Sequence, residues 1–456
     1  MEEFLMRWRS LRFQAWHAVL GGVAIVLGLV AYGAAVEHGA TGGDNLIARA
    51  AVSFARIPSE TMKVIRSIRN DHHPMHAKRH DRFGGASGFE RFVPASGDPG
   101  LLALSRFDPV KQRNIVEIVD LTDGSVLNIY SVDEQYVHSQ TRRRIPTIDL
   151  EPDRDRLRFG MVHPLVEPDG SIIFTGMSTA MVKLDACSQI EWLVDGAFHH
   201  AIEKDPQGNY WVPGVLYPHR LNGVSDEFRD DSLTKISPEG EILLERSLAE
   251  IVSRSGREYA ILAPAVEPED PLHLNDIQPV ASDGPYWKAG DVFLSIRNLS
   301  AVALYRPSTD EIVWWRQGPW LMQHDVDVLN EREIAVFDNR ANTHGPRYVV
   351  AGHNNFPVYN FETDEVTRPF DEAFRVQNIR SATQGRSELL PDGELFVEEQ
   401  NHGRVLQMDR DGKLSWQYVN RGEDGKIYQV HWSRWIPPAL AAQVRTSLAE
   451  KQCSAG

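Results

Sequence analysis

Histidines recur at one place in a repeated sequence pattern, and they are the side chains of this chain best suited to chemistry. An imidazole changes charge near pH 7, so it can act as a nucleophile or transfer a proton. Four segments begin with such a histidine: "HPLVEPDGSIIFTG" from His163, "HHAIEKDPQGNYWV" from His199, "HLNDIQPV" from His273 and "HDVDVLNEREIAVFDN" from His324. Histidines in register predict one shared polar pocket.

A structural role is the alternative for each of these histidines, because a single buried histidine is more often a hydrogen-bonded core residue than a catalyst. Four histidines at the same relative place in the pattern indicate that one shared role explains all four. We favour a functional role for His273 and His324. Both roles stay open for His163 and for His200, the second histidine of the "HH" pair.

β-Hairpins are the elements that would position these histidines. A second pattern joins an apolar segment, a polar turn with Asp or Gly, and a strand of alternating apolar residues, as hairpins require. It occurs six times, starting at Val119, Leu184, Ile236, Tyr305, Tyr359 and Met408. Two hairpins make one four-stranded blade, so we predict an all-β fold, a six-bladed β-propeller over residues 88–436. Each histidine would then begin an innermost strand facing the central axis. A pair of β-sandwiches is the alternative architecture.

The composition limits the classes of partner. The chain has 456 residues, with 48 Lys and Arg against 63 Asp and Glu, a formal net charge of -15. This balance argues against nucleic acid as a partner, because such binding depends on clustered cations that neutralise phosphates. The two cysteines, Cys187 and Cys453, could form one disulfide, but we expect Cys453 to be exposed rather than paired.

An apolar run of 19 uncharged residues, 18–36, lies near the N-terminus. As a helix rising about 1.5 Å per residue, it is long enough to cross the hydrocarbon core of a bilayer. Because Arg7, Arg9 and Arg12 precede it, we predict that residues 1–17 stay in the cytoplasm. The run would be a single-pass anchor in a bacterial inner membrane, with the globular part in the periplasm. A cleaved signal peptide is the alternative, because small residues near the end of the run resemble a processing site.

Two further segments complete the predicted organisation. Residues 37–87 are expected to form a helical linker, and residues 437–456 a short C-terminal tail helix. The linker carries four closely spaced histidines, which could indicate a metal site: His72, His73, His76 and His80. Pro74 breaks the helical spacing that would bring these imidazoles together, and no cysteine or carboxylate pattern completes a ligand set. We therefore predict no metal site and no cofactor.

Six motifs follow one another between residues 160 and 436. They are "HLNDI", "FLSIRNLSAVALYRPSTDEIVWW", "QHDVDVL", "IAVFDN", "LLPDGELFV" and "GRVLQMDRDGKLSWQY". Together this series resembles the bacterial arylsulfotransferase family. The resemblance implies a periplasmic six-bladed propeller that moves a sulfuryl group from a phenolic ester to another phenol without a nucleotide donor. It also implies a ping-pong route through a sulfated histidine, with an aryl sulfate or other small anionic ligand as the substrate.

The resemblance assigns residues to a sulfate site. It implies that His273 and His324 line the site and that an arginine after the "FDN" strand clamps the anion, a place that Arg347 fits better than Arg340. Asn275 would orient the acceptor. Guanidinium and imidazolium groups suit this role because they stabilise the charge on sulfate oxygens. The other expected binding residues are His163, His200 and Arg386.

The sequence departs from the family at the nucleophile. The sulfated histidine of the family is expected on the inner strand of the last blade, where this chain has "SATQGRSELLPDG". His402 is the nearest candidate; otherwise His324 or His273 takes over, or transfer activity is lost. In the last case the propeller would bind an anionic ligand or act as a scaffold beside a membrane protein. A third hypothesis makes the histidines ligands of Fe, Mn or Zn in a lyase or oxygenase.

Overall fold

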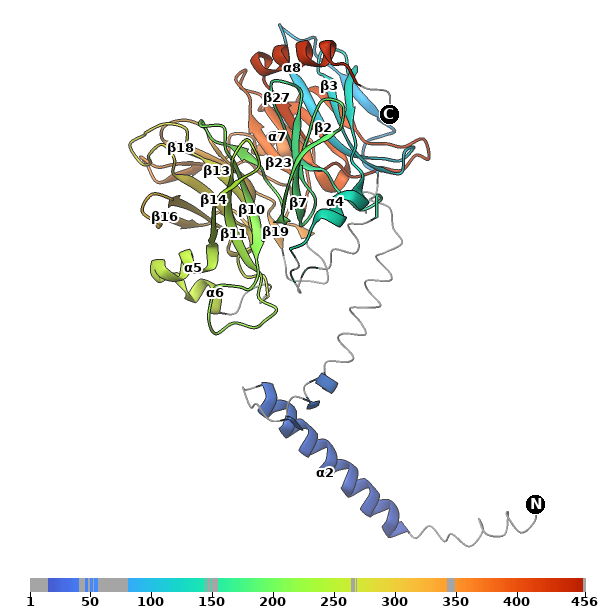
Figure 1. The fold of residues 1–456 in the computed structure, drawn as a ribbon, viewed down its shortest axis with the longest axis vertical. Helices are drawn as coiled ribbons and strands as arrows, with labels where there is room; N and C mark the ends of the chain where they lie inside the picture. The colour runs from blue at the N-terminus through green and yellow to red at the C-terminus, as the bar shows by residue number, and fades with distance from the viewer. Residues whose placement is uncertain are drawn as a thin grey trace, which may run out of the picture. The chain divides into compact units, whose positions relative to one another are not determined.

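The computed structural model divides the chain into two units, Met1–His73 and Pro74–Gly456, which are described separately (Figure 1). The described residues are 15–40, 46–47, 50–51, 53–55, 81–143, 145, 148, 155–263, 267, 269–342 and 349–453. Several residues singled out from the sequence lie outside these ranges, namely His72, His73, His76, His80 and Arg347.

The first unit contains the apolar run within the helix α2 (Ala15–Ala40). Its segment His17–His38 is long and apolar enough to cross a membrane, judged by length and composition alone. A helix suits such a run because it satisfies every backbone N–H and C=O internally. A signal sequence near an N-terminus has the same character, so an anchor and a signal peptide both fit this helix.

The second unit is an all-β, propeller-like arrangement of antiparallel sheets. One sheet has, in order, β27 (Arg434–Ile436), β2 (Leu101–Asp108), β3 (Arg113–Asp120) and β4 (Val126–Tyr130). An eight-stranded sheet follows, with β5 (Val162–Val166), β6 (Ile172–Thr175), β7 (Thr179–Leu184), β8 (Ile190–Phe198), β9 (Glu203–Lys204), β10 (Tyr210–Leu216), β11 (Asp230–Ile236) and β12 (Ile242–Ser247). Its two halves are joined through β8 and β10 at a single register pair, Phe198 with Gly214.

Three further sheets continue along the chain. The first has β13 (Leu274–Pro279), β14 (Val292–Ile296), β15 (Ala301–Arg306) and β16 (Glu311–Gln317). The second has β17 (His324–Val328), β18 (Glu333–Phe337), β21 (Val358–Asn360) and β22 (Glu365–Thr367). The third has β23 (Arg386–Leu389), β24 (Leu395–Glu399), β25 (Arg404–Met408), β26 (Leu414–Val419) and β1 (Gly88–Arg91). A small two-stranded sheet contains β19 (Ala341–Asn342) and β20 (Val349–Val350).

The six hairpins predicted from the sequence are confirmed. They are β3–β4, β7–β8, β11–β12, β15–β16, β21–β22 and β25–β26. Glycine adopts a positive φ without steric cost, and Asp tolerates it better than most residues, which explains their recurrence at the turns. Each turn contains one residue with a positive φ, namely Gly124 (80°), Ser188 (63°), Gly240 (85°), Asp310 (60°), Asp364 (57°) and Gly412 (83°).

Apolar clusters lie between consecutive sheets and hold them together. Val116 of β3 packs in one cluster with Phe174 and Val182 of the eight-stranded sheet. In another cluster, Phe293 of β14 packs with Val336 of β18. Strands covered on both faces are expected to be apolar on both faces, and β5, β6 and β14 are buried along their whole length.

Strands from both ends of the second unit close the sheet arrangement. The C-terminal strand β27 pairs with β2, with Leu101 opposite Ile436 (Figure 1). The N-terminal strand β1 pairs with β26 at the edge of the last sheet, with Gly88 opposite Val419. Each end of the chain therefore completes a sheet made mainly by the other end.

Short helices and turns connect the strands, and one longer helix ends the chain. They are α4 (Glu134–Gln140), α5 (Leu248–Val252), η2 (Ser253–Arg257), α6 (Tyr259–Leu262), η3 (Arg297–Leu299), α7 (Asp371–Val376), η4 (Gln400–His402) and α8 (Pro438–Glu450). Helix α8 buries Ala441, Val444 and Leu448 in the apolar cluster between β2–β4 and β5–β7.

Cys453 is exposed, as expected, but the expectation that it is unpaired is wrong. Cys453 forms a disulfide with Cys187, which lies 266 residues earlier in the turn between β7 and β8. The reason is the packing of α8, because Leu448 also reaches Gly170 of the same part of the sheet and brings the chain end to Cys187. Docking of the tail helix could not be inferred from its local sequence.

Candidate functional site

Backbone conformation marks the place where the inner strands begin. Residues other than glycine seldom adopt a positive φ, and such strain occurs most often at functional sites. Three of the predicted histidines have this conformation: His163 (49°), His200 (60°) and His273 (56°). Residues at the start of three further inner strands have it as well, namely Asp325 (49°), Gln384 (59°) and Trp432 (57°).

The rings of His199, His200, His273, His324 and Trp432 form one group, which we call the imidazole cluster. His200 is at its centre, and its ring centroid lies 5.2 Å from that of His273 and 6.1 Å from that of His324. The predicted pocket thus brings His200, His273 and His324 together, although they come from three different sheets.

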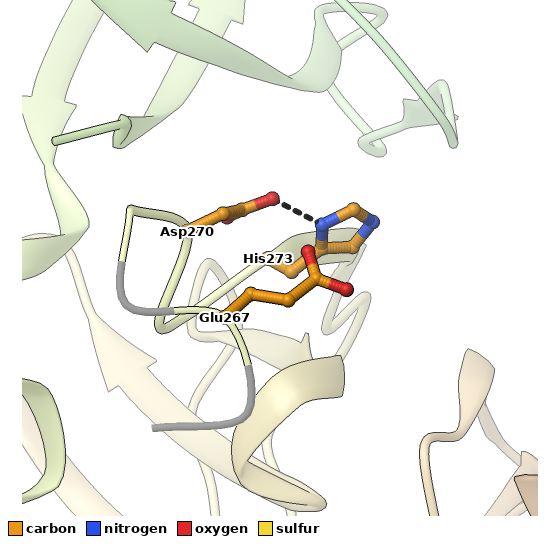
Figure 2. A group of neighbouring side chains, drawn as sticks. All are labelled: Glu267, Asp270 and His273. Carbon is orange, nitrogen blue, oxygen red and sulfur yellow. Dashed lines mark hydrogen bonds and ion pairs between the residues drawn. The ribbon is translucent and has the colours of Figure 1, made fainter. Parts of the chain in front are cut away.

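Asp270 orients His273. Its Oδ2 lies 2.5 Å from Nδ1 of His273 (Figure 2). A carboxylate at this distance accepts the Nδ1 proton, so the lone pair of the neutral ring is on Nε2. The side chain of His273 is 18% exposed, whereas His199 and His324 are each 1% exposed. Of these three imidazoles, His273 is therefore the one that a solute reaches most readily, and His200 is partly exposed as well.

Glu267, Asp270 and His273 are also close enough to hold a metal ion, since one potential ligand atom from each lies within 4.8 Å of the others (Figure 2). Asp270 already has two partners, His273 and the guanidinium of Arg229, whose Nη1 is 3.8 Å from Oδ2. Both partners engage Oδ2 of Asp270, whereas its Oδ1 is buried without a hydrogen-bond partner. We interpret Asp270 as the group that orients the ring.

His324 is held on both sides of its ring. Asn339 donates from Nδ2 to the backbone carbonyls of Ser381 and Gln384, and its Oδ1 is 2.7 Å from Nδ1 of His324. That amide orientation makes Nδ1 of His324 the donor. Nε2 accepts the backbone N–H of Gln384 at 3.1 Å. Both nitrogens are engaged, so His324 is poorly placed to attack a substrate.

His199 and His200 contact each other through Nδ1 atoms that are 2.7 Å apart. On its other side, Nε2 of His199 lies 3.5 Å from Oδ1 of Asp231. Asp231 is fully buried in β11 and also pairs with Arg229, whose Nε is 3.0 Å from Oδ1. Burial opposes the ionisation of Asp231, but Arg229 and His199 hold its pKa below the ordinary value.

Burial keeps four imidazoles of this region neutral, those of His163, His199, His200 and His324. It lowers the pKa of His163, His200 and His324 well below the ordinary value, and nearby arginines or histidines lower it further. Burial also lowers the pKa of His199, although Asp231 partly offsets the effect. Neutral imidazole has a free lone pair, which a nucleophile or base requires.

Trp432 was not predicted from the sequence to be a residue of the site. Its ring centroid is 5.9 Å from those of His200 and His324 and 5.2 Å from that of His163. Its backbone N–H donates to Oε1 of Glu398 at 2.6 Å. The segment "HWSRWI" before and within β27 begins an inner strand as the histidine segments do. A search for histidine alone overlooked the aromatic residue at this place.

The remaining predicted residues occupy several places. His163 is buried against Trp432, accepts the N–H of Ile202 at Nδ1 (2.9 Å), and has Arg434 2.7 Å from Nε2. Asn275 is buried and donates from Nδ2 to the carbonyl of Gln323 at 3.2 Å. His402 is buried in η4, between β24 and β25. The roles proposed for these residues from the sequence stay predictions.

Arg386 belongs to a group of charged residues, the Arg386 cluster: Glu203, Asp276, Asp325, Asp327, Arg386 and Glu388. It pairs with Asp325 at 3.7 Å through Nε and with Glu388 at 3.3 Å through Nη2. Burial raises the pKa of Asp276, Asp325, Asp327 and Glu388, and their mutual repulsion adds to it. Burial would lower the pKa of Arg386, but these carboxylates raise it.

Comparisons with known proteins identify relatives of this chain. A family model described as arylsulfotransferase (ASST) matches residues 162–421, more than half of the chain. No curated protein is significantly similar in sequence. A Bacteroides caccae protein of unknown function is 12% identical, with 73% of this chain and 98% of the other covered and a TM-score of 0.45. Virginiamycin B lyase from Staphylococcus aureus is 11% identical, with 73% and 89% covered and a TM-score of 0.36. Hydrazine synthase from Kuenenia stuttgartiensis is 12% identical, with 73% and 81% covered and a TM-score of 0.36.

Proposed function

The chain belongs to the arylsulfotransferase family, and we propose that it moves a sulfuryl group from an aryl sulfate to a phenol through a sulfated histidine. The meeting of His200, His273 and His324 around one point is the observation that carries this proposal. Neutral imidazoles packed against an aromatic ring suit an aryl ester, because they offer lone pairs beside an apolar surface.

His273 is the proposed nucleophile. Its Nε2 attacks the sulfur atom, the N–S bond forms, and the bond from sulfur to the aryl oxygen breaks, so that phenolate leaves with the electron pair. The sulfated ring is positively charged, and Asp270 at Nδ1 balances that charge. In the second half-reaction an acceptor phenol attacks the sulfur atom, and the electron pair of the N–S bond returns to Nε2. Two displacements remove the need to bind both phenols at once.

Positive charge for the sulfate oxygens is proposed to come from Arg229, which lies beside Asp270. Arg347 is retained as the clamp expected from the family resemblance. His324 would shape the pocket, because both of its ring nitrogens are engaged by Asn339 and Gln384.

We propose that the propeller has six blades, counting the eight-stranded sheet as two blades that meet at Phe198 and Gly214. Six hairpins at matching places support this count. So do the six larger of the eight apolar clusters among the described residues, each shared by neighbouring groups of strands. The predicted span of the propeller, residues 88–436, is kept.

We place the second unit in the bacterial periplasm and propose that α2 anchors the chain in the inner membrane. The length and apolar character of α2 support an anchor. The disulfide between Cys187 and Cys453 supports an oxidising compartment, because reducing systems of the cytoplasm keep most thiols free. Removal of α2 as a signal peptide would lead to the same compartment without the anchor.

A binding module without catalysis is the second candidate function. It is favoured by Gln384, which stands where the family resemblance leads us to expect the sulfated histidine and whose backbone N–H occupies Nε2 of His324. Such a module would hold an aryl sulfate or another small anion in the same pocket, beside a membrane partner.

The test is incubation of the purified protein with 4-nitrophenyl sulfate and phenol. We expect release of 4-nitrophenol, formation of phenyl sulfate, and a sulfuryl group on the peptide that contains His273, detected by mass spectrometry at alkaline pH. Binding of the ester, seen by calorimetry, without release of 4-nitrophenol would favour the binding module instead.

A further inference from the structure

We propose that His200 is the general base that takes the proton of the acceptor phenol, with His199 and Asp231 as positioning residues that draw the proton onward. This inference rests on the proposed sulfuryl transfer. It assigns a proton path to the second half-reaction, which the nucleophile alone does not provide.

The contact between His199 and His200 requires one shared proton. Their Nδ1 atoms are 2.7 Å apart, a hydrogen-bond distance. Each neutral imidazole has one N–H and one lone pair, so one of these two nitrogens donates and the other accepts. The direction of this bond determines which nitrogen of His200 carries its lone pair.

Asp231 selects the direction. Its carboxylate is fully buried, accepts the N–H of Leu274 at 2.6 Å, and is paired with Arg229, so it is fixed in place as an anion. Oδ1 lies 3.5 Å from Nε2 of His199 and attracts a proton there. With its proton on Nε2, His199 has a lone pair on Nδ1, and His200 must be the donor of the shared bond.

The free lone pair of His200 is consequently on Nε2. Its ring packs against His273 at 5.2 Å, His324 at 6.1 Å and Trp432 at 5.9 Å, so the lone pair belongs to the imidazole cluster, beside the proposed nucleophile. His324 cannot serve in its place, because Asn339 and Gln384 engage both of its nitrogens. His273 carries the sulfuryl group at this stage.

The proposed step is balanced in protons and electrons. The acceptor oxygen attacks the sulfur atom, and the N–S bond returns its electron pair to Nε2 of His273. The phenolic proton passes to Nε2 of His200, while the Nδ1 proton of His200 passes to Nδ1 of His199. His199 becomes an imidazolium beside Asp231, which stabilises it, and the extra proton is later released to water.

The test compares acceptor phenols of different acidity in the variant His200→Gln, with 4-nitrophenyl sulfate as the donor. For phenols that are protonated at the assay pH, we expect transfer to fall by about 10²–10⁴-fold. The loss should shrink to a few-fold for phenols that are already ionised, because they need no base. A stoichiometric release of 4-nitrophenol without acceptor, even at a reduced rate, shows that the variant is folded and that His273 reacts.

Asp231→Asn is the second variant, and Asp230→Asn is its matched control. Asp230 is the neighbouring buried carboxylate, and it accepts bonds from Ser247 and from the N–H of Arg220 instead of facing His199. We expect Asp231→Asn to reproduce the dependence on phenol acidity with a smaller loss, and Asp230→Asn to leave that dependence unchanged. If His200→Gln fails to release 4-nitrophenol, the dependence of transfer on phenol acidity in Asp231→Asn tests the proposal instead.

An equal loss for all phenols, or no loss, in variants that still release 4-nitrophenol would overturn the proton path and leave the sulfuryl transfer intact. Failure of the unmodified protein to release 4-nitrophenol at all would instead overturn the proposed function. The two failures are therefore distinguishable.

Discussion

The imidazole cluster and the Arg386 cluster both arise from the inner strands of the propeller, yet burial gives them opposite properties. His273 and Asp276 are three residues apart at the start of β13, and His324 and Asp325 are adjacent in β17. Burial lowers the pKa of His324 but raises the pKa of Asp276 and Asp325. In both cases the uncharged form is favoured.

The two clusters differ in the chemistry of their uncharged side chains. A neutral imidazole has a lone pair and can react, whereas a protonated carboxyl group is a hydrogen-bond donor with little nucleophilicity. The carboxylates also surround Arg386, so the ionised members serve as its counter-charge. We propose that the imidazole cluster performs the chemistry and that the Arg386 cluster stabilises the strands that carry the imidazoles.

The variant His273→Gln tests this division most directly. Loss of the nucleophile should reduce sulfuryl transfer by about a thousand-fold or more, measured as 4-nitrophenol release, with the melting temperature nearly unchanged. His353→Gln is a suitable control, because His353 pairs with Asp371 outside both clusters. Full activity in His273→Gln would remove His273 as the nucleophile.

In contrast, the variant Arg386→Met should lower the stability of the protein. Removing the cation leaves Asp325 and Glu388 without their partner, and breaking a buried pair lowers the free energy of unfolding by about 3–5 kcal/mol. Urea denaturation measures this loss of free energy of unfolding. The control Arg332→Met removes an exposed pair with Glu362, and its effect on the free energy of unfolding should be much smaller because solvent screens that pair. Equal effects of the two variants would contradict a structural role for the Arg386 cluster.

Replacing both Cys187 and Cys453 by Ser supplies a reference outside the two clusters. The disulfide closes a separation of 266 residues, and its removal should lower the free energy of unfolding by about 2–4 kcal/mol. Transfer activity per folded molecule should stay the same. A comparable loss of activity would mean that the tail helix α8 supports the site.

Glu398 is a buried carboxyl group that should make the stability of the protein depend on pH. Burial raises its pKa to about 7, although the N–H groups of Trp432 and Ser433 oppose this shift. Between the ordinary pKa of about 4.3 and about 7, the folded chain binds more protons than the unfolded chain, so stability falls as pH rises through this range. The contribution is about 3–4 kcal/mol, since each pKa unit corresponds to about 1.4 kcal/mol. Glu398→Gln should flatten this part of a stability–pH curve measured by urea denaturation; an unchanged slope would be the contrary result.

Metal removal should have no effect on transfer. Dialysis against EDTA, followed by elemental analysis and the 4-nitrophenyl sulfate assay, should leave the rate unchanged, because the proposed transfer uses Asp270 to orient His273 and needs no metal ion. Loss of activity that Mn²⁺ or Zn²⁺ restores would instead make Glu267, Asp270 and His273 a metal site.

The parts of the fold set by neighbouring residues were predictable from the sequence. The hairpin turns repeat a local composition, and each contains a residue such as Gly240 or Asp310 that accepts a positive φ. The histidine segments were also recognisable, because His200, His273 and His324 start comparable strands and do converge.

The partners of these histidines could not be predicted, because they depend on tertiary packing. Asp231 reaches His199 from another strand, and Asn339 reaches His324 across a hairpin. Neither contact leaves a pattern in the sequence. Trp432 and the pairing of Cys453 were not predicted for the same reason, because the position of β27 beside β2 and the docking of α8 determine what each contacts.

The pairing of strands from the two ends of the second unit affects when the fold can be completed during synthesis. Gly88 pairs with Val419, and Leu101 pairs with Ile436, so more than 300 residues separate each pair of partners. Contacts of such long sequence separation form slowly, since a long loop must close first. A growing polypeptide therefore lacks β26 and β27, the partners of β1 and β2, until synthesis is nearly finished, so both closing strand pairs form only after the last segment has left the ribosome.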